Sequence, residues 1–208
     1  EFNTYLGCIR ALVDHVFGGV MTSCLVNPRA CHETQLNIIP TTAKKRVAVV
    51  GAGPAGLSAA TTLATRGHEV SLFDSASEIG GQFNIAKQIP GKEEFSETLR
   101  YYGRQIELLG ITLHLNQRVT AEQLNSGGFD EVVIATGIAP RTPDIAGIDH
   151  PKVMSYLDVI GAKKPVGKKV AIIGAGGIGF DVAEFLVQDG HSPTMHLDEW
   201  LAEWGVVD

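Results

Sequence analysis

Residues 44–74 read KKRVAVVGAGPAGLSAATTLATRGHEVSLFD and contain the pattern that decides the fold. The short run Arg46–Val50 is apolar and rich in valine, which is typical of a buried parallel strand. Pro54 stands where a helix would begin, because its missing N–H costs nothing there, and Gly67 marks the end of that helix. A second apolar strand follows and ends at Asp74. The stretch therefore predicts a strand, a glycine turn, a helix and a second strand.

Gly51, Gly53 and Gly56 form a G-x-G-x-x-G pattern between the first strand and the helix. The first glycine permits a tight turn, the second lets a pyrophosphate approach the backbone, and the third lets helix and strand pack closely. The N–H groups at the helix start favour phosphate. Asp74 lies 23 residues after Gly51, where a carboxylate can accept hydrogen bonds from an adenosine ribose. The unit predicts a dinucleotide site, and the alternative is a purely structural turn.

The following residues continue the α/β pattern. Apolar side chains recur every three or four positions over residues 93–109 and predict an amphipathic helix. The runs ITLHLN (111–116) and EVVIATG (131–137) predict strands. Gly80–Gly81 and Thr136–Gly137 are places where backbone can come close to a cofactor, although an ordinary loop or strand exit explains either pair equally well.

A second glycine pattern, Gly174, Gly176 and Gly179, follows the run KKVAII (168–173) and predicts another strand, turn and helix. No carboxylate stands at the end of a second strand about 20 residues later. The last residues instead suggest a short helix with an apolar stripe that includes Trp200 and Trp204. Two dinucleotide units in one chain suggest two dinucleotides, and a flavin with a nicotinamide is the natural pair for hydride chemistry.

The composition limits the classes of function. The chain has 208 residues, 44% of them hydrophobic, and a net charge of −6, which argues against a nucleic-acid surface. It contains no apolar run of about 18 residues and no recognisable export signal, so we expect a cytoplasmic protein without a membrane span. Its three cysteines are then expected to be reduced thiols or metal ligands.

Five stretches together resemble the bacterial NADPH-dependent 2,4-dienoyl-CoA reductases, which are iron–sulfur flavoproteins of the old-yellow-enzyme type. They are TSCLVNPRACHET, VVGAGPAGLSAA, SEIGGQFNIAKQIPGKEEFSETLRYY, DHPKVMSYLDVI and AIIGAGGIGFDVAEFL. The resemblance implies an FAD domain with an inserted NADPH domain, preceded by a four-cysteine 4Fe–4S segment and an FMN-containing barrel with the catalytic residues. Electrons would pass from NADPH through FAD and the cluster to FMN and the dienoyl-CoA of fatty-acid β-oxidation.

By this resemblance the chain is the central part of a longer oxidoreductase. We expect a cysteine-containing segment (1–43, irregular), a Rossmann-like FAD domain without its C-terminal return (44–145), and the start of a second Rossmann-like NAD(P)H domain (146–208). The barrel would be a missing partner domain, and no catalytic residue would lie in this chain. The implied FAD contacts are Gly51, Gly53, Pro54, Ala55, Gly56, Asp74, Gly81, Gln82, Val119, Ala135, Thr136 and Gly137, and the implied NADPH contacts are Gly174, Gly176, Gly177, Ile178 and Gly179.

The family's cluster pattern, C-x2-C-x3-C-x11-C, falls on Tyr5, Cys8, Leu12 and Cys24. Only Cys8 and Cys24 would remain as ligands, whereas a 4Fe–4S cluster uses four thiolates. Cys31 lies outside the pattern, and His15 and His32 are further candidate ligands. The alternative is that these cysteines are small apolar residues without a metal.

Two other functions stay open. One is an electron-transfer subunit similar to the small subunit of glutamate synthase, which also joins cysteine clusters to two dinucleotide folds. The other is a non-catalytic remnant that binds nucleotides. The sequence does not distinguish NADPH from NADH, because the residues that make this choice stand at the end of a second strand that we do not find.

Overall fold

The computed structural model describes residues 3–4, 10–188 and 192–206, and these divide into two compact units. The first unit contains the described residues of 1–81 and 97–137, and the second contains those of 82–96 and 138–208. The chain therefore leaves the first unit at Gly81, returns at Glu97 and leaves again after Gly137. Each unit is described by itself below.

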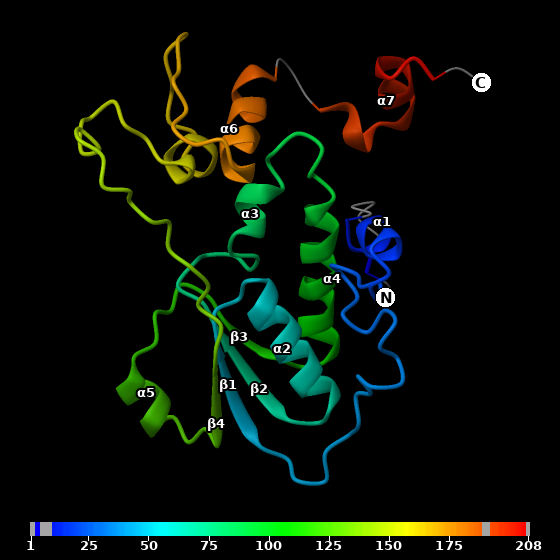
Figure 1. Cartoon of the computed structure of the whole chain (residues 1–208). Coiled ribbons are helices and arrows are strands. Elements are labelled where there is room, and N and C mark those ends of the chain that lie inside the picture. The colour runs from blue at the N-terminus through cyan, green and yellow to red at the C-terminus, as the bar shows by residue number, and fades with distance from the viewer. Residues whose placement is uncertain (1–2, 5–9, 189–191, 207–208) are drawn as a thin grey trace. The chain divides into compact units, whose positions relative to one another are not determined.

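The first unit contains a four-stranded parallel sheet with the order β3-β2-β1-β4 (Figure 1). Its strands are β1 (Arg46–Val50), β2 (Glu69–Phe73), β3 (Thr112–His114) and β4 (Glu131–Ile134). In the register, Val49 lies opposite Leu72 of β2 and Val133 of β4. The parallel α/β fold predicted from the sequence is confirmed.

The core of this unit forms where β1 meets the helix that follows it. Val47, Ala48 and Val49 are at most 2% exposed, because β1 has a neighbouring strand on both sides. The helix α2 (Pro54–Thr65) lies along the sheet in Figure 1 and buries Leu57 and Ala60. The predicted amphipathic helix is α4 (Phe95–Leu108), and its buried residues are Thr98, Leu99 and Ile106.

Two short helices of the first unit were not predicted. α5 (Ala121–Ser126) begins with a capping box in which Thr120 and Gln123 exchange hydrogen bonds. α1 (Arg10–Phe17) lies in the segment expected to be irregular, so that expectation is wrong for these eight residues. α1 ends at Gly18–Gly19, where Gly19 has a φ of +65°. No Ser, Thr, Asp or Asn stands directly before Arg10 to signal the start of a helix, and the described apolar side chains Val13, Val16 and Phe17 are 40%, 59% and 88% exposed.

The second unit consists of short helical elements around a small apolar core. These elements are α3 (Phe83–Ala86), the π-helical turn η1 (Leu157–Gly161), α6 (Gly177–Val187), the 3-10 turn η2 (Pro193–Met195) and α7 (Leu197–Glu203). Its buried core residues are Ile89, Val159, Ile160 and Val182. α6 and α7 agree with the predicted helices.

The strand predicted over residues 168–173 is wrong, because Val170–Ile173 is irregular chain outside any sheet. Val170, Ile172 and Ile173 are 49%, 40% and 78% exposed. A strand requires a hydrogen-bonded neighbour, and the described part of the second unit offers none.

No helix among the described residues is long and apolar enough to cross a membrane.

Candidate dinucleotide-binding sites

The turn after β1 brings the carboxyl ends of β1, β2 and β4 together in the first unit. Gly51 has a φ of +108°, and its N–H donates to the Phe73 carbonyl oxygen at 2.7 Å. A Cβ on Gly51 would lie 2.2 Å from the Ala135 carbonyl oxygen, and a Cβ on Gly56 would lie 1.7 Å from the Gly51 carbonyl oxygen. Neither position has room for a side chain, so the packing of the fold itself requires both glycines.

Gly53 differs from these two glycines because the protein itself leaves room beside it. It caps α2 with φ −76° and ψ −179°, which other residues also adopt, and no side chain hydrogen-bonds to the first turn of the helix. A Cβ on Gly53 would meet only the Gly81 Cα, at 4.0 Å. Gly81 has a φ of +52°, and its neighbour Gly80 donates its N–H to the Ala52 carbonyl oxygen at 2.8 Å.

This arrangement fits the pyrophosphate of FAD. The start of α2 has no side-chain cap, so the N–H groups of Ala55 and Gly56 can donate to an anion, while Pro54 has no N–H and fixes the first helical residue. The side-chain-free surface of Gly53 and Gly81 provides the close approach that a diphosphate needs, and a methyl group on Gly53 would fill it. The predicted FAD residues Gly51, Gly53, Pro54, Ala55, Gly56 and Gly81 are therefore grouped at one turn.

Asp74 has a structural role that the sequence did not reveal. Its Oδ2 accepts the Ala52 N–H at 2.6 Å, and its Oδ1 accepts the Ala76 N–H at 2.8 Å. The carboxylate therefore joins the end of β2 to the glycine turn. Each carboxylate oxygen has two lone pairs, so Asp74 can also accept from a ribose hydroxyl as predicted.

The remaining FAD candidates of the first unit lie at two different places. The Ala135 N–H donates to the Val50 carbonyl oxygen at 2.8 Å, so Ala135 and Thr136 lie beside the glycine turn, and Gly137 follows with a φ of +72°. Val119 lines a pocket of about 280 Å³, and the other lining residues are Phe73, Gln117, Gln123, Leu124, Ser126, Gly127 and Phe129. Ala135 and Thr136 therefore lie at the glycine turn. Val119 instead lines this pocket.

The second glycine turn reproduces the local geometry of the first. Gly174 has a φ of +122°, and a Cβ on Gly179 would lie 2.2 Å from the Gly174 carbonyl oxygen. Gly176 caps α6 with φ −88° and ψ −178°, again without a side-chain hydrogen bond. A Cβ on Gly176 or Gly177 would meet nothing within 4 Å, and the neighbouring Ile178 is 56% exposed. The turn is therefore open for a second pyrophosphate, although no strand precedes it.

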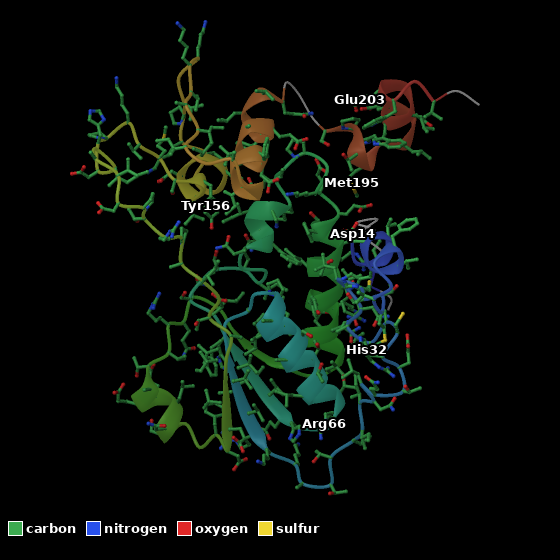
Figure 2. All side chains as sticks on the ribbon, in the orientation of Figure 1. Asp14, His32, Arg66, Tyr156, Met195 and Glu203 are labelled. Carbon is green, nitrogen blue, oxygen red and sulfur yellow. The ribbon has the colours of Figure 1, made fainter. Side chains whose placement is uncertain are left out.

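Gln82, the remaining FAD candidate, belongs to the second unit. Its Oε1 accepts a hydrogen bond from the Tyr156 hydroxyl at 3.2 Å, and Figure 2 shows Tyr156 beside the yellow η1 turn. In the same unit the Lys92 ammonium lies 2.6 Å from Asp181 Oδ1 of α6. Tyr156, Lys92 and Asp181 were not identified from the sequence, because each contact joins residues more than 70 positions apart.

The cysteines do not form a recognisable metal site among the described residues. Cys24 is half-buried and Cys31 is exposed, and both are free thiols. Cys8 lies outside the described residues. The described His15 hydrogen-bonds the Met21 carbonyl oxygen at 3.0 Å, and His32, labelled in Figure 2, hydrogen-bonds Gln35 Oε1 at 3.3 Å. No group of three or more His, Cys, Asp or Glu side chains in the described ranges could hold a metal ion.

Comparison with known proteins identifies the family. Residues 45–201 match the pyridine nucleotide-disulphide oxidoreductases. The chain belongs to the pyridine nucleotide-disulphide oxidoreductase family. Membership implies binding of FAD and of NAD(P)H, which agrees with the two glycine turns.

Several relatives are similar over most of the chain. The metal reductase of Desulforamulus reducens is 35% identical over 189 residues, which is 89% of this chain. The cinnamate reductase of Clostridium sporogenes is 35% identical over 191 residues, or 91% of this chain. The solved structure of 2-naphthoyl-CoA reductase in complex with 2-naphthoyl-CoA is 38% identical over 87% of this chain, with a TM-score of 0.84. The chain spans 28% of the length of each of these three proteins.

Proposed function

We propose that this chain is the electron-entry portion of an NADPH-dependent 2,4-dienoyl-CoA reductase of fatty-acid β-oxidation, where NADPH and FAD bind. The observation that carries the proposal is the pair of glycine turns in a chain of this family. One turn follows a strand and has Asp74 at its side, and the other starts α6. Two pyrophosphate turns fit one donor and one acceptor of hydride.

The residues of the first turn have distinct roles in this proposal. The N–H groups of Ala55 and Gly56 donate to the diphosphate, and Gly53 and Gly81 leave space for it. Asp74 accepts from the ribose while it holds the Ala52 backbone in place. FAD supplies the redox chemistry when bound, and this chain binds and orients it.

The second turn is assigned to NADPH, with Gly174, Gly176, Gly177, Ile178 and Gly179 around its pyrophosphate. We accordingly assign residues 44–145 to the FAD domain and 146–208 to the NADPH domain. Residues 82–96 and 138–145 are exceptions, because they pack with the second unit. Gln82, the FAD candidate of this first segment, thus belongs to the same unit as the residues assigned to NADPH.

An acyl-CoA substrate is favoured by one relative. The 2-naphthoyl-CoA reductase is 38% identical to this chain and was solved with 2-naphthoyl-CoA. The metal reductase and the cinnamate reductase act on other substrates by their names, although all three share this segment. We infer that the segment delivers electrons and that the substrate is chosen elsewhere in the longer protein, by the proposed FMN barrel.

The iron–sulfur part of the resemblance does not fit the residues present. The pattern leaves two thiolates, Cys8 and Cys24, and puts Tyr5 and Leu12 at the other two positions. A 4Fe–4S cluster needs four ligands, so we derive no electron-transfer step through a cluster on this chain.

Flavin identification and NADPH oxidation test the proposal. We expect the purified chain to be yellow and to release FAD, not FMN, on denaturation, because only FAD has the adenosine that Asp74 can bind. NADPH should be oxidised slowly with an artificial dye as acceptor, whereas a 2,4-dienoyl-CoA should not be reduced above a free-flavin control, because no catalytic acid is expected here. Release of FMN, or absence of any flavin uptake, would refute the assignment of the first turn.

The acyl-CoA part needs a separate experiment. The chain, loaded with FAD, is mixed with the isolated FMN barrel of a dienoyl-CoA reductase, NADPH and a 2,4-dienoyl-CoA. Reduction of the dienoyl-CoA that requires both proteins supports the proposal. Reduction of a dye but never of the acyl-CoA favours the alternative of a general electron-transfer subunit.

A further inference from the structure

α6 packs in the second unit against the small apolar core. The chain before it, Val170–Ile173, makes no strand, so the usual sheet support of such a helix is missing among the described residues. Val182 of α6 packs into the core with Ile89, Val159 and Ile160. The ion pair between Lys92 and Asp181 is one of the polar contacts beside this core.

The position of Lys92 is well defined, because its own segment is anchored at two points. Ile89, three residues before it, is 2% exposed in the apolar core. Gln82, at the start of the segment, accepts a hydrogen bond from Tyr156. The Lys92 and Asp181 side chains are 40% and 29% exposed, so the pair is partly shielded from water. A lysine on such a segment has a defined place from which to hold a carboxylate.

Asp181 places a negative charge close to the second glycine turn. It is the fifth residue of α6, one helical turn after Gly177. A carboxylate so near the start of a helix is favourable for the helix dipole but repels an anion that binds there. The Lys92 ammonium, 2.6 Å from Asp181 Oδ1, cancels that charge and holds the carboxylate toward the 82–96 segment.

We propose that Lys92 is a positioning residue for the nicotinamide nucleotide, acting through Asp181. The inference rests on the proposed function of the second turn and deepens it. According to this inference, NADPH affinity depends on a residue of the 82–96 segment, which follows the FAD candidate Gly81 in the sequence. Lys92 need not touch the nucleotide, because its effect is to remove the repulsion that Asp181 would exert on the pyrophosphate.

Calorimetric titration of the FAD-loaded full chain with NADPH tests this proposal. Lys92→Met should weaken NADPH binding roughly five- to tenfold, the range typical of coupled charged neighbours, and the loss should shrink at about 0.5 M salt. Lys92→Arg should bind NADPH as the unmodified chain does. The double variant Lys92→Met/Asp181→Asn should recover affinity to within about twofold, because no unpaired carboxylate remains.

Lys164→Met is the matched control. Lys164 pairs with Asp158 in the same unit, and neither residue lies on α6, so this variant loses a similar ion pair without exposing Asp181. It should leave NADPH affinity unchanged.

Any one of three results would overturn the proposal. They are that Lys92→Met binds NADPH as tightly as the unmodified chain, that the double variant binds as weakly as Lys92→Met, or that Lys164→Met weakens binding to the same extent. Failure of the unmodified chain to bind NADPH would instead refute the proposed function of the second turn, and with it this role of Lys92. Binding by the unmodified chain together with insensitivity to Lys92→Met would refute the role of Lys92 alone.

Discussion

Gly53→Ala separates the requirements of the ligand from those of the fold. An alanine at position 53 can keep the observed φ of −76°, and its Cβ would meet only the Gly81 Cα at 4.0 Å, an ordinary van der Waals contact. The lower backbone entropy of the unfolded alanine chain stabilises the fold by about 0.4–1 kcal/mol. The poorer N-cap offsets this by roughly 0.5–1 kcal/mol. The free energy of unfolding should therefore change by less than about 1 kcal/mol.

The same methyl group should weaken FAD binding. It would occupy the surface that the diphosphate needs at the start of α2, and forcing atoms into a close-packed contact costs roughly 1–3 kcal/mol. We expect the affinity for FAD to fall by about tenfold or more.

Gly56→Ala is the matched comparison within the same turn. Its Cβ would lie 1.7 Å from the Gly51 carbonyl oxygen, so backbone must move. Overpacking costs up to about 3 kcal/mol where backbone must move, so even after the gain of about 1 kcal/mol for alanine in a helix we expect a loss of about 2 kcal/mol in the free energy of unfolding. Urea unfolding followed by circular dichroism gives the stability of both variants, and titration of the apoprotein with FAD gives the affinity. The reasoning is refuted if Gly53→Ala unfolds as easily as Gly56→Ala, or if it binds FAD as the unmodified chain does.

Three further predictions concern other side chains. Asp74→Ala should lower the free energy of unfolding and the free energy of FAD binding by about 1–3 kcal/mol each, because the Ala52 and Ala76 N–H groups lose their acceptor. Urea unfolding and FAD titration measure the two effects, and a variant that loses only FAD affinity would contradict the structural role of Asp74. Hydrogen bonds from Lys164 and Ser155 hold the pKa of Asp158 well below its ordinary value of 3.8, so the stabilisation is present above that pH and is lost as the pH falls through the folded-state pKa. Asp158→Asn should therefore lower the melting temperature at neutral pH, with a difference that shrinks below about pH 4; equal melting at pH 7 would count against it. Anaerobic reconstitution with iron and sulfide should give no stoichiometric 4Fe–4S signal in electron paramagnetic resonance, whereas Tyr5→Cys with Leu12→Cys should raise iron retention, and no gain would show that the cluster pattern is misplaced.

The first unit could be predicted from the sequence because its signals are local and consistent. The apolar run Arg46–Val50, the glycines and Pro54 each favour the conformation that the neighbouring residues also favour. The tertiary structure added the contacts of Asp74, whose carboxylate bonds to Ala52 across 22 positions. No local pattern reports such a contact, so the sequence indicated only the ribose role.

The two glycine turns show what the sequence alone determined. Gly51 and Gly174 both have strongly positive φ values, Gly53 and Gly176 both cap a helix in extended conformation, and Gly56 and Gly179 both approach the carbonyl oxygen of the first glycine. These features depend on which residues lack a Cβ, so a few consecutive residues are enough to specify them. The sequence therefore determined the shape of both turns and the helix that follows each one.

Only the tertiary structure decided which turn is supported by a sheet. The valine-rich run 46–50 and the run 168–173 are similarly apolar, yet the first is a strand between two neighbours and the second is exposed chain. A strand is stabilised by hydrogen bonds to other segments, and its own residues do not say whether those segments are present. For the same reason the sequence could not show that residues 82–96 pack against α6 through Lys92 and Asp181, since that arrangement depends on contacts between distant parts of the chain.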